Sequence, residues 1–249
     1  MLIMLSFRLL SLVLFVLVIG LWHFLSIKGF FVIIPSPLAV YECFLANLNV
    51  LQVAIFDSLR RFFIGYILGA FLGVILGLIL GRFRPLEILL EPFTQFLRPL
   101  SPLALLPLIV LIFGIGDIGA IFIIAYSVFF PILFLCISGV RNIPKQRLLM
   151  AQNFGANERL IFYHIILPST FLSIASGLKL AAAIAFIQLV AAEMLGVQSG
   201  LGYMIIDGRN LLQVDYILVA IIVIGFLGFV LQILFSLLEN FIKARMGHK

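Results

Sequence analysis

The feature that most constrains this chain is the run of 19 residues from Phe62 to Leu80, which contains no charged side chain. A helix needs about 20 apolar residues to cross the hydrocarbon core of a bilayer, so this run predicts a membrane span. Two runs of 23 residues, over 118–140 and 216–238, are also free of charge. Only 10% of the 249 residues are charged, whereas soluble domains carry about 25%. The sequence therefore predicts an all-α membrane protein.

Three more spans are expected, which gives one bundle of six transmembrane helices. An apolar run over 9–19 is expected to be an uncleaved first span, because the bulky residues at 21–24 do not suit a cleavage site. Residues 99–113 are expected to form a short span with an irregular, proline-rich entry, and residues 171–192 a longer one. The chain is thus divided into an N-terminal span with an external interfacial segment over 1–57, a core over 58–241 and a tail over 242–249.

In the run over 62–80, glycines recur every four residues, at Gly65, Gly69, Gly73 and Gly77. This spacing places them on one face of a helix, where small residues allow a second helix to approach closely. We expect this face to be a packing surface, and a functional groove there is the less favoured alternative.

The positions of lysine and arginine predict the orientation of the bundle. With a cytoplasmic N-terminus, 11 of these residues face the cytoplasm and 4 face outward, as the positive-inside rule requires. Both termini and the loop over 141–168 are then cytoplasmic. The basic residues form no run, so the net charge of +6 does not indicate binding to nucleic acid. The three histidines and two cysteines lack metal-ligand spacing, and no metal site is expected.

The cytoplasmic loop predicts a short exposed helix. Pro144 suits the first position of a helix and Gly155 suits the residue after its end, while Asn157 is placed to cap a second helix. An apolar stripe is expected on the first helix, from Leu148, Leu149, Ala151 and Phe154. Composition favours a helix lying on lipid headgroups, and the alternative is a helix that docks in a groove of a soluble partner.

This loop resembles that of the membrane permease subunits of binding-protein-dependent ATP-binding-cassette (ABC) importers. In that family a glycine is followed, after nine residues, by Ile-x-Leu-Pro, and here Gly155 precedes residues 165–168 at this spacing. The family's Glu-Ala-Ala falls on 149–151, where leucine replaces the glutamate and one alanine is kept. Residues 113–117, 189–196 and 199–203 resemble the branch that includes nitrate, sulfonate and taurine permeases.

The resemblance implies a type I importer permease whose loop helix transmits motion from an ATPase. The residues that the family pattern assigns to this coupling are Leu149, Met150, Ala151, Phe154, Gly155, Ile165, Leu167 and Pro168. It also implies three kinds of partner: a second permease copy that forms a homodimer, two ABC ATPase subunits, and an extracytoplasmic substrate-binding protein. The implied location is a bacterial plasma membrane, and the implied cargo is a small anion. The sequence contains no phosphate-binding loop, so we expect ATP and Mg²⁺ to be used by the ATPase, and this chain to be a transport subunit without enzymatic activity or bound cofactor.

Ionisable and polar residues within spans are costly and often functional. Lys179, Gln188 and Glu193 are therefore candidates to line a translocation path. The alternatives are that Lys179 extends to the cytoplasmic face, that Gln188 bonds a neighbouring helix, and that Glu193 meets water at the external end.

An external mouth is suggested by four further residues, Arg60, Arg61, Gly200 and Gly202. The arginines are candidates to attract an anion, with interfacial anchoring as their default role. A tight turn accounts equally well for the two glycines.

Two other classes of protein were weighed. An intramembrane serine protease needs Gly-x-Ser-Gly and a histidine in a later span, and this constellation does not occur in the sequence. An ATP-independent secondary transporter or a membrane scaffold stays the alternative to an importer permease.

Overall fold

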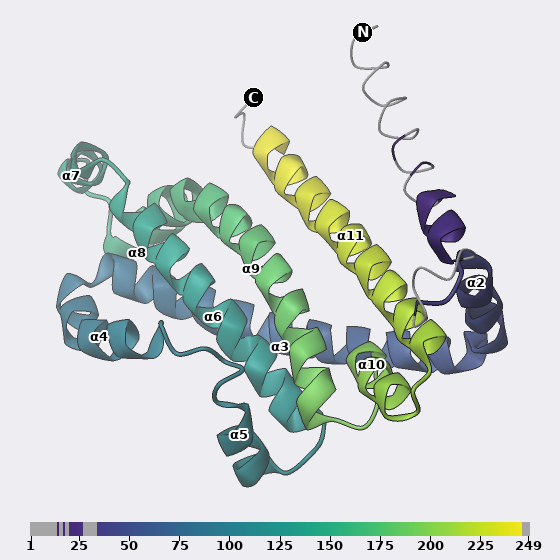
Figure 1. Cartoon of the computed structure of the whole chain (residues 1–249). Coiled ribbons are helices and arrows are strands. Elements are labelled where there is room, and N and C mark those ends of the chain that lie inside the picture. Colours follow the sequence, from purple (N-terminus) through teal and green to yellow (C-terminus); the bar gives the residue numbers. More distant parts are fainter. Residues whose placement is uncertain (1–13, 15–16, 18–19, 27–33, 246–249) are drawn as a thin grey trace, which may run out of the picture.

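The computed structural model describes residues 14, 17, 20–26 and 34–245, and every element with assigned bounds in this part of the chain is a helix (Figure 1). The expected first span over 9–19 lies largely outside the described residues. In chain order the elements are α2 (Pro37–Ala46), α3 (Leu48–Arg82), α4 (Arg84–Leu97), α5 (Leu106–Phe113), α6 (Asp117–Arg141), α7 (Lys145–Asn153), α8 (Glu158–Ile161), the π-helix η1 (Phe162–Ile166), α9 (Leu167–Gly196), α10 (Leu201–Asn210) and α11 (Val214–Arg245).

Four stretches of helix are long and apolar enough to cross a membrane, by length and composition. They are α3, α6, the continuous stretch Glu158–Gly196 and α11 over Val214–Ala244. These stretches contain the spans expected at 62–80, 118–140, 171–192 and 216–238, and thus confirm that each of these four segments is a long apolar helix.

The expectation of a span over 99–113 is wrong. The only helix there is α5, whose eight residues extend about 12 Å at 1.5 Å per residue, too short for a hydrocarbon core of about 30 Å. Pro107 would interrupt the interior of a helix over 99–113, but it is tolerated in the first turn of α5, where the structure places it. Since α3 and α6 run in the same direction, the chain returns between them through α4, an irregular linker and α5 together.

Residues 48–57 also differ from expectation, because they belong to α3 rather than to an interfacial segment. Asn47 precedes α3, and the helix then continues for 35 residues, about 52 Å. A helix longer than the hydrocarbon core tilts or projects beyond it. Residues 48–57 therefore extend the long helix α3 and do not form a separate segment.

The glycine face of α3 packs on α6, as expected. A β-carbon added at Gly69 would lie 2.9 Å from Val128 Cβ, and one added at Gly77 would lie 2.5 Å from Cys136 Cβ. These separations are shorter than van der Waals contact, so the two helices approach more closely than side chains would allow. We call this contact the glycine seam, comprising Gly65, Gly69, Gly73, Gly77 and, one turn further, Gly81.

Replacing Gly69 by leucine is expected to destabilise the protein by about 1–3 kcal/mol, because the new side chain forces α3 and α6 apart. Gly225 of α11 is the matched control, since nothing lies within 4 Å of a β-carbon placed there. The check is the thermal unfolding midpoint of each purified variant in detergent. Equal midpoints for Gly69→Leu and Gly225→Leu would contradict the close contact.

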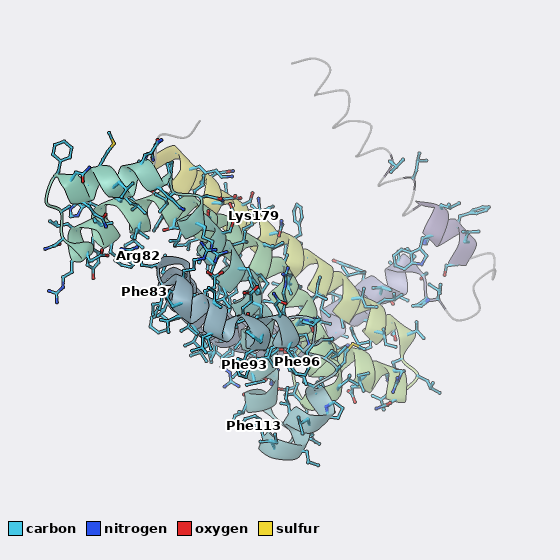
Figure 2. The ribbon with its side chains drawn as sticks, turned by 90° about the vertical axis from the view of Figure 1, so that its left-hand side faces the viewer. Arg82, Phe83, Phe93, Phe96, Phe113 and Lys179 are labelled. Atoms are coloured by element: carbon cyan, nitrogen blue, oxygen red, sulfur yellow. The ribbon has the colours of Figure 1, made fainter. Side chains whose placement is uncertain are left out.

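The remaining helices extend the bundle from this pair. Helix α9 packs antiparallel to α6, and α11 lies on α9 (Figure 1). Helices α7 and α8 lie at one end of the molecule, and α2 and α10 lie toward the other. Helix α4 and α5 expose apolar side chains, among them Phe93, Phe96 and Phe113 (Figure 2). Such an outer surface suits lipid or another apolar partner.

Candidate functional site

The loop helix α7 forms as expected, with small shifts at its ends. Pro144 is the residue before the helix rather than its first residue. Gly155 has a φ of +77°, a left-handed conformation that glycine adopts without a steric penalty, and it turns the chain after α7. Asn157 caps α8, because its side-chain oxygen accepts a hydrogen bond from the backbone N–H of Leu160 at 2.9 Å.

The apolar residues of α7 are divided between two faces, whereas one stripe was expected. Leu148 and Ala151 are half-buried against the main core. Leu149, Met150 and Phe154 point outward, with exposed fractions of 57%, 61% and 90%. The inner pair attaches α7 to the bundle. The outer three leave an exposed apolar surface, the α7 outer face, at one end of the molecule.

The second half of the loop pattern has a different role. Ile165 and Leu167 pack against the core, while Pro168 is exposed. Pro168 has no N–H to continue the α-helical ladder, and just before it the helix widens, so that the N–H of Leu167 bonds the Phe162 carbonyl five residues earlier. Residues 165–168 therefore join the loop to α9. Of Ile165, Leu167 and Pro168, only Pro168 is exposed.

Ion pairs hold this end of the bundle together. Arg82, at the end of α3, pairs with Glu158 of α8, and Arg141, at the end of α6, pairs with Glu87 of α4. The sequence shows charges at these helix ends but not which of them meet. The Arg82–Glu158 pair places α8 beside the end of α3 at which the glycine seam ends.

The opposite end of the bundle contains a buried ionic network. Arg61 and Glu193 are 2% and 0% exposed, and Arg61 Nη1 lies 2.8 Å from Glu193 Oε1. Arg61 Nε lies 2.7 Å from Asp117 Oδ1 at the start of α6, and Nη1 donates to the Ser199 carbonyl at 2.9 Å. One guanidinium thus connects α3, α6, α9 and the turn before α10.

Glu193 also fixes the start of α10. Its carboxylate accepts hydrogen bonds from the Gly202 N–H at 2.9 Å and from the Ser58 hydroxyl at 2.8 Å, and negative charge is favourable at a helix N-terminus. Gly200 has a φ of +101°, and a β-carbon there would lie 2.7 Å from Arg61 Nη1 and collide with Glu193. The glycines are therefore required by close approach to the network.

The structure shows the surroundings of four of these polar residues. Arg61 is not an exposed attractor of anions, since it is buried and neutralised. Arg60 is partly exposed and pairs with Asp117. Glu193 does not line the cavity described below. Lys179 pairs with Glu239 of α11, its Nζ lying 2.9 Å from Oε2. The pairings of Arg61 and Glu193 join segments 132 residues apart, which no local pattern reveals.

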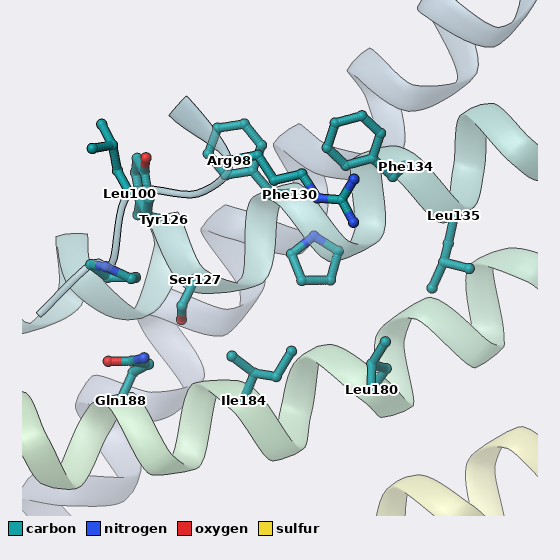
Figure 3. A pocket seen from close by; sticks show the side chains of 12 residues that line it. Arg98, Leu100, Tyr126, Ser127, Phe130, Phe134, Leu135, Leu180, Ile184 and Gln188 are labelled. Atoms are coloured by element: carbon teal, nitrogen blue, oxygen red, sulfur yellow. The ribbon is translucent and has the colours of Figure 1, made fainter. Parts of the chain in front are cut away.

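Gln188 does lie in a cavity, of about 520 Å³, between α6, α9 and the linker after α4 (Figure 3). The cavity is mainly apolar, with walls from Phe130, Phe134 and Ile184. Its charged lining residue is Arg98, which lies with its guanidinium carbon 4.6 Å from the centre of the Phe134 ring. In the sequence Arg98 contributes only to the expected orientation of the bundle, because nothing in the local pattern shows that it turns toward α6.

The comparisons with known proteins agree with this architecture. Residues 69–248 match the family described as binding-protein-dependent transport system inner membrane component. The chain is 36% identical to a protein of Escherichia coli K12 described as an aliphatic sulfonates transport permease, SsuC, over 90% of this chain and 86% of that protein. It is 31% identical to the taurine transport permease TauC of the same organism, over 58% of this chain and 53% of TauC.

A solved structure shows the same fold at low sequence identity. A chain of the inward-facing MetNI methionine ABC transporter superposes with a TM-score of 0.68 and 14% identity, over 79% of this chain and 98% of that one. The bundle therefore has the fold of type I importer permeases. On the family match and the permease relatives together, this chain belongs to the inner membrane components of binding-protein-dependent ABC transport systems, which are transport subunits and not enzymes.

Proposed function

We propose that this chain couples import of a small organic anion to ATP hydrolysis by separate ATPase subunits. The observation that carries the proposal is the α7 outer face. Three apolar side chains are exposed on a short helix that is attached to the core by Leu148 and Ala151. Exposed apolar side chains on a rigid support are typical of a surface that a partner covers. An apolar groove on the ATPase subunit is the proposed partner surface.

The proposed assembly follows the expectation from the family. Two copies of this chain form the path, two ATPase subunits bind ATP and Mg²⁺, and a substrate-binding protein delivers cargo from outside. This chain binds neither ATP nor metal. In the proposed orientation α7 and both termini lie in the cytoplasm, and the Arg61 network lies near the external surface. The names of SsuC and TauC support a sulfonate-type anion as cargo.

The test is reconstitution of the permease with an ABC ATPase and a substrate-binding protein from the same genome. We expect the three to copurify in part and to drive ATP-dependent uptake of a sulfonate into proteoliposomes. An ATP-independent secondary transporter predicts uptake by the permease alone along an ion gradient. Uptake of that kind, without any binding of the ATPase, would overturn the proposal.

Gly155→Val is expected to impair this coupling while leaving insertion intact. A β-branched residue is strained at a φ of +77° by about 1–2 kcal/mol, and relief of that strain would reorient α7. If the functional orientation of α7 becomes less stable by this amount, ATP-driven uptake is expected to fall about 5- to 30-fold.

Gly155→Asn is the matched control, because asparagine tolerates the left-handed conformation. It is expected to retain most of the uptake. The measurements are uptake in proteoliposomes and the amount of permease in the membrane, and normal ATP-driven uptake by Gly155→Val would count against the role of α7.

A further inference from the structure

The cavity beside Gln188 lies about midway along the bundle. Gln188 is eight residues before the end of α9, and Leu180 is 13 residues after its start, which places them about 12 Å and 20 Å from the two ends. Its volume of about 520 Å³ falls in the range of small-molecule sites, roughly 300–1,000 Å³. A site at this depth is positioned to hold a cargo between the two ends of the bundle.

The charge of the cavity is positive. Arg98 is the charged residue among the twelve described residues that line it, and within the described part of the chain Arg98 makes no ion pair. Arg98 is exposed in this protomer, whereas Arg82 and Arg141 are each paired with a glutamate. A guanidinium without a carboxylate, beside an apolar cavity, favours an anionic ligand, for which it offers a planar set of donors.

The polar groups occupy only part of the lining. Gln188 and Ser127 face one another across one end of the cavity, and Arg98 extends along α6 toward Phe134 (Figure 3). Most of the remaining lining is apolar and includes Phe130, Phe134 and Leu135 of α6, Leu180 and Ile184 of α9, and residues of the linker after α4. The ligand that fits both parts has one anionic headgroup and an uncharged hydrocarbon tail.

A cationic group on the ligand is disfavoured, because the cavity already contains the positive charge of Arg98. No carboxylate belongs to the twelve described residues of the lining, so the ammonium group of taurine would lose its water here without an ion partner. Desolvating an unpaired charge in an apolar environment costs several kcal/mol. The cavity chemistry thus separates alkanesulfonates from taurine, although relatives of both names resemble this chain.

We propose that this cavity is a binding subsite for alkanesulfonates in the permease itself, with Arg98 holding the sulfonate and the α6–α9 walls holding the alkyl chain. This inference rests on the proposed function and names its substrate class. It assigns part of the selection of cargo to the membrane subunit, in addition to the binding protein that delivers the cargo.

The headgroup is tested by titrating 1-hexanesulfonate into the assembled permease–ATPase complex in nanodiscs, followed by calorimetry. Arg98→Gln is expected to weaken binding at least tenfold. The control is Arg84, an exposed arginine at the start of α4 and outside the cavity, whereas Arg98 follows the end of that helix. Arg84→Gln is expected to bind as the wild type does. Equal affinity of Arg98→Gln and the wild type, or no binding of hexanesulfonate by the wild type, would overturn the subsite.

The tail is tested with ligands of different length and charge. Ile184→Trp is expected to weaken binding of hexanesulfonate severalfold while sparing methanesulfonate, and Ile187→Trp, on an exposed face of α9, is expected to spare both. Taurine is expected to bind at least tenfold more weakly than hexanesulfonate, and equal affinity would overturn the proposed selectivity. If ATP-driven uptake persists while these differences are absent, only the subsite fails. If the ATPase does not associate with the permease, the proposed function fails.

Discussion

Replacing Arg61 by alanine is expected to destabilise the protein by about 3–5 kcal/mol, the cost of leaving a buried charge without its partner. Glu193 is completely buried, and the arginine 2.8 Å away is its paired cation. The same change removes the link from α3 to Asp117 and to the Ser199 carbonyl. We expect a large fall in the unfolding midpoint of the purified chain in detergent.

The adjacent Arg60 is the matched control, because it also pairs with Asp117 but is 45% exposed. Arg60→Ala is expected to cost no more than about 1 kcal/mol, as exposed ion pairs do. The double variant Arg61→Met with Glu193→Gln should recover part of the loss, since neither charge is then left alone. If Arg61→Ala and Arg60→Ala shift the midpoint equally, the buried network does not stabilise the fold as described.

Placing aspartate at both Met150 and Phe154 is expected to lower ATP-driven uptake at least about tenfold. These side chains are 61% and 90% exposed in this chain, so their replacement removes nothing from the core. Loss of one well-packed apolar side chain at the centre of an interface typically costs about 2 kcal/mol or more, and about 1.4 kcal/mol corresponds to a factor of ten. The readouts are copurification of the ATPase and uptake into proteoliposomes.

Gln152→Asp introduces one such charge at an exposed position of α7, directly after the inward-facing Ala151. It is expected to leave copurification and uptake close to those of the wild type. A helix that only lies on lipid headgroups predicts another outcome, in which the double aspartate variant weakens contact with anionic vesicles but leaves the ATPase bound. That result would remove α7 from the coupling path.

Local sequence patterns were sufficient for much of the fold. Four of the expected spans lie within long apolar helices. Three of them contain a charge-free run of 19 or more residues, which has few other stable states in a bilayer. The four-residue spacing of glycine predicted the seam between α3 and α6, and Pro144, Gly155 and Asn157 predicted the ends of α7 and α8. Each of these features depends on residues within a few positions of one another.

The errors arose where local signals conflicted. Over 99–113 prolines interrupt an apolar segment, so hydropathy indicated a span where the chain forms a linker and the short helix α5. On α7, one apolar stripe was expected from Leu148, Leu149, Ala151 and Phe154. Their division into an inner pair and an outer group depends on where the core lies, and the helix sequence does not contain that information.

What the sequence by itself determined is the membrane environment, four long helices, the seam and the exposed loop helix, because hydropathy, spacing and backbone restrictions act over short stretches of chain. Only the tertiary structure decided that Arg61 is neutralised by Asp117 and Glu193, and that Arg98 and Gln188 border one cavity. Electrostatic and packing energies depend on distance in space. Residues more than 50 positions apart acquire that distance only when the helices assemble.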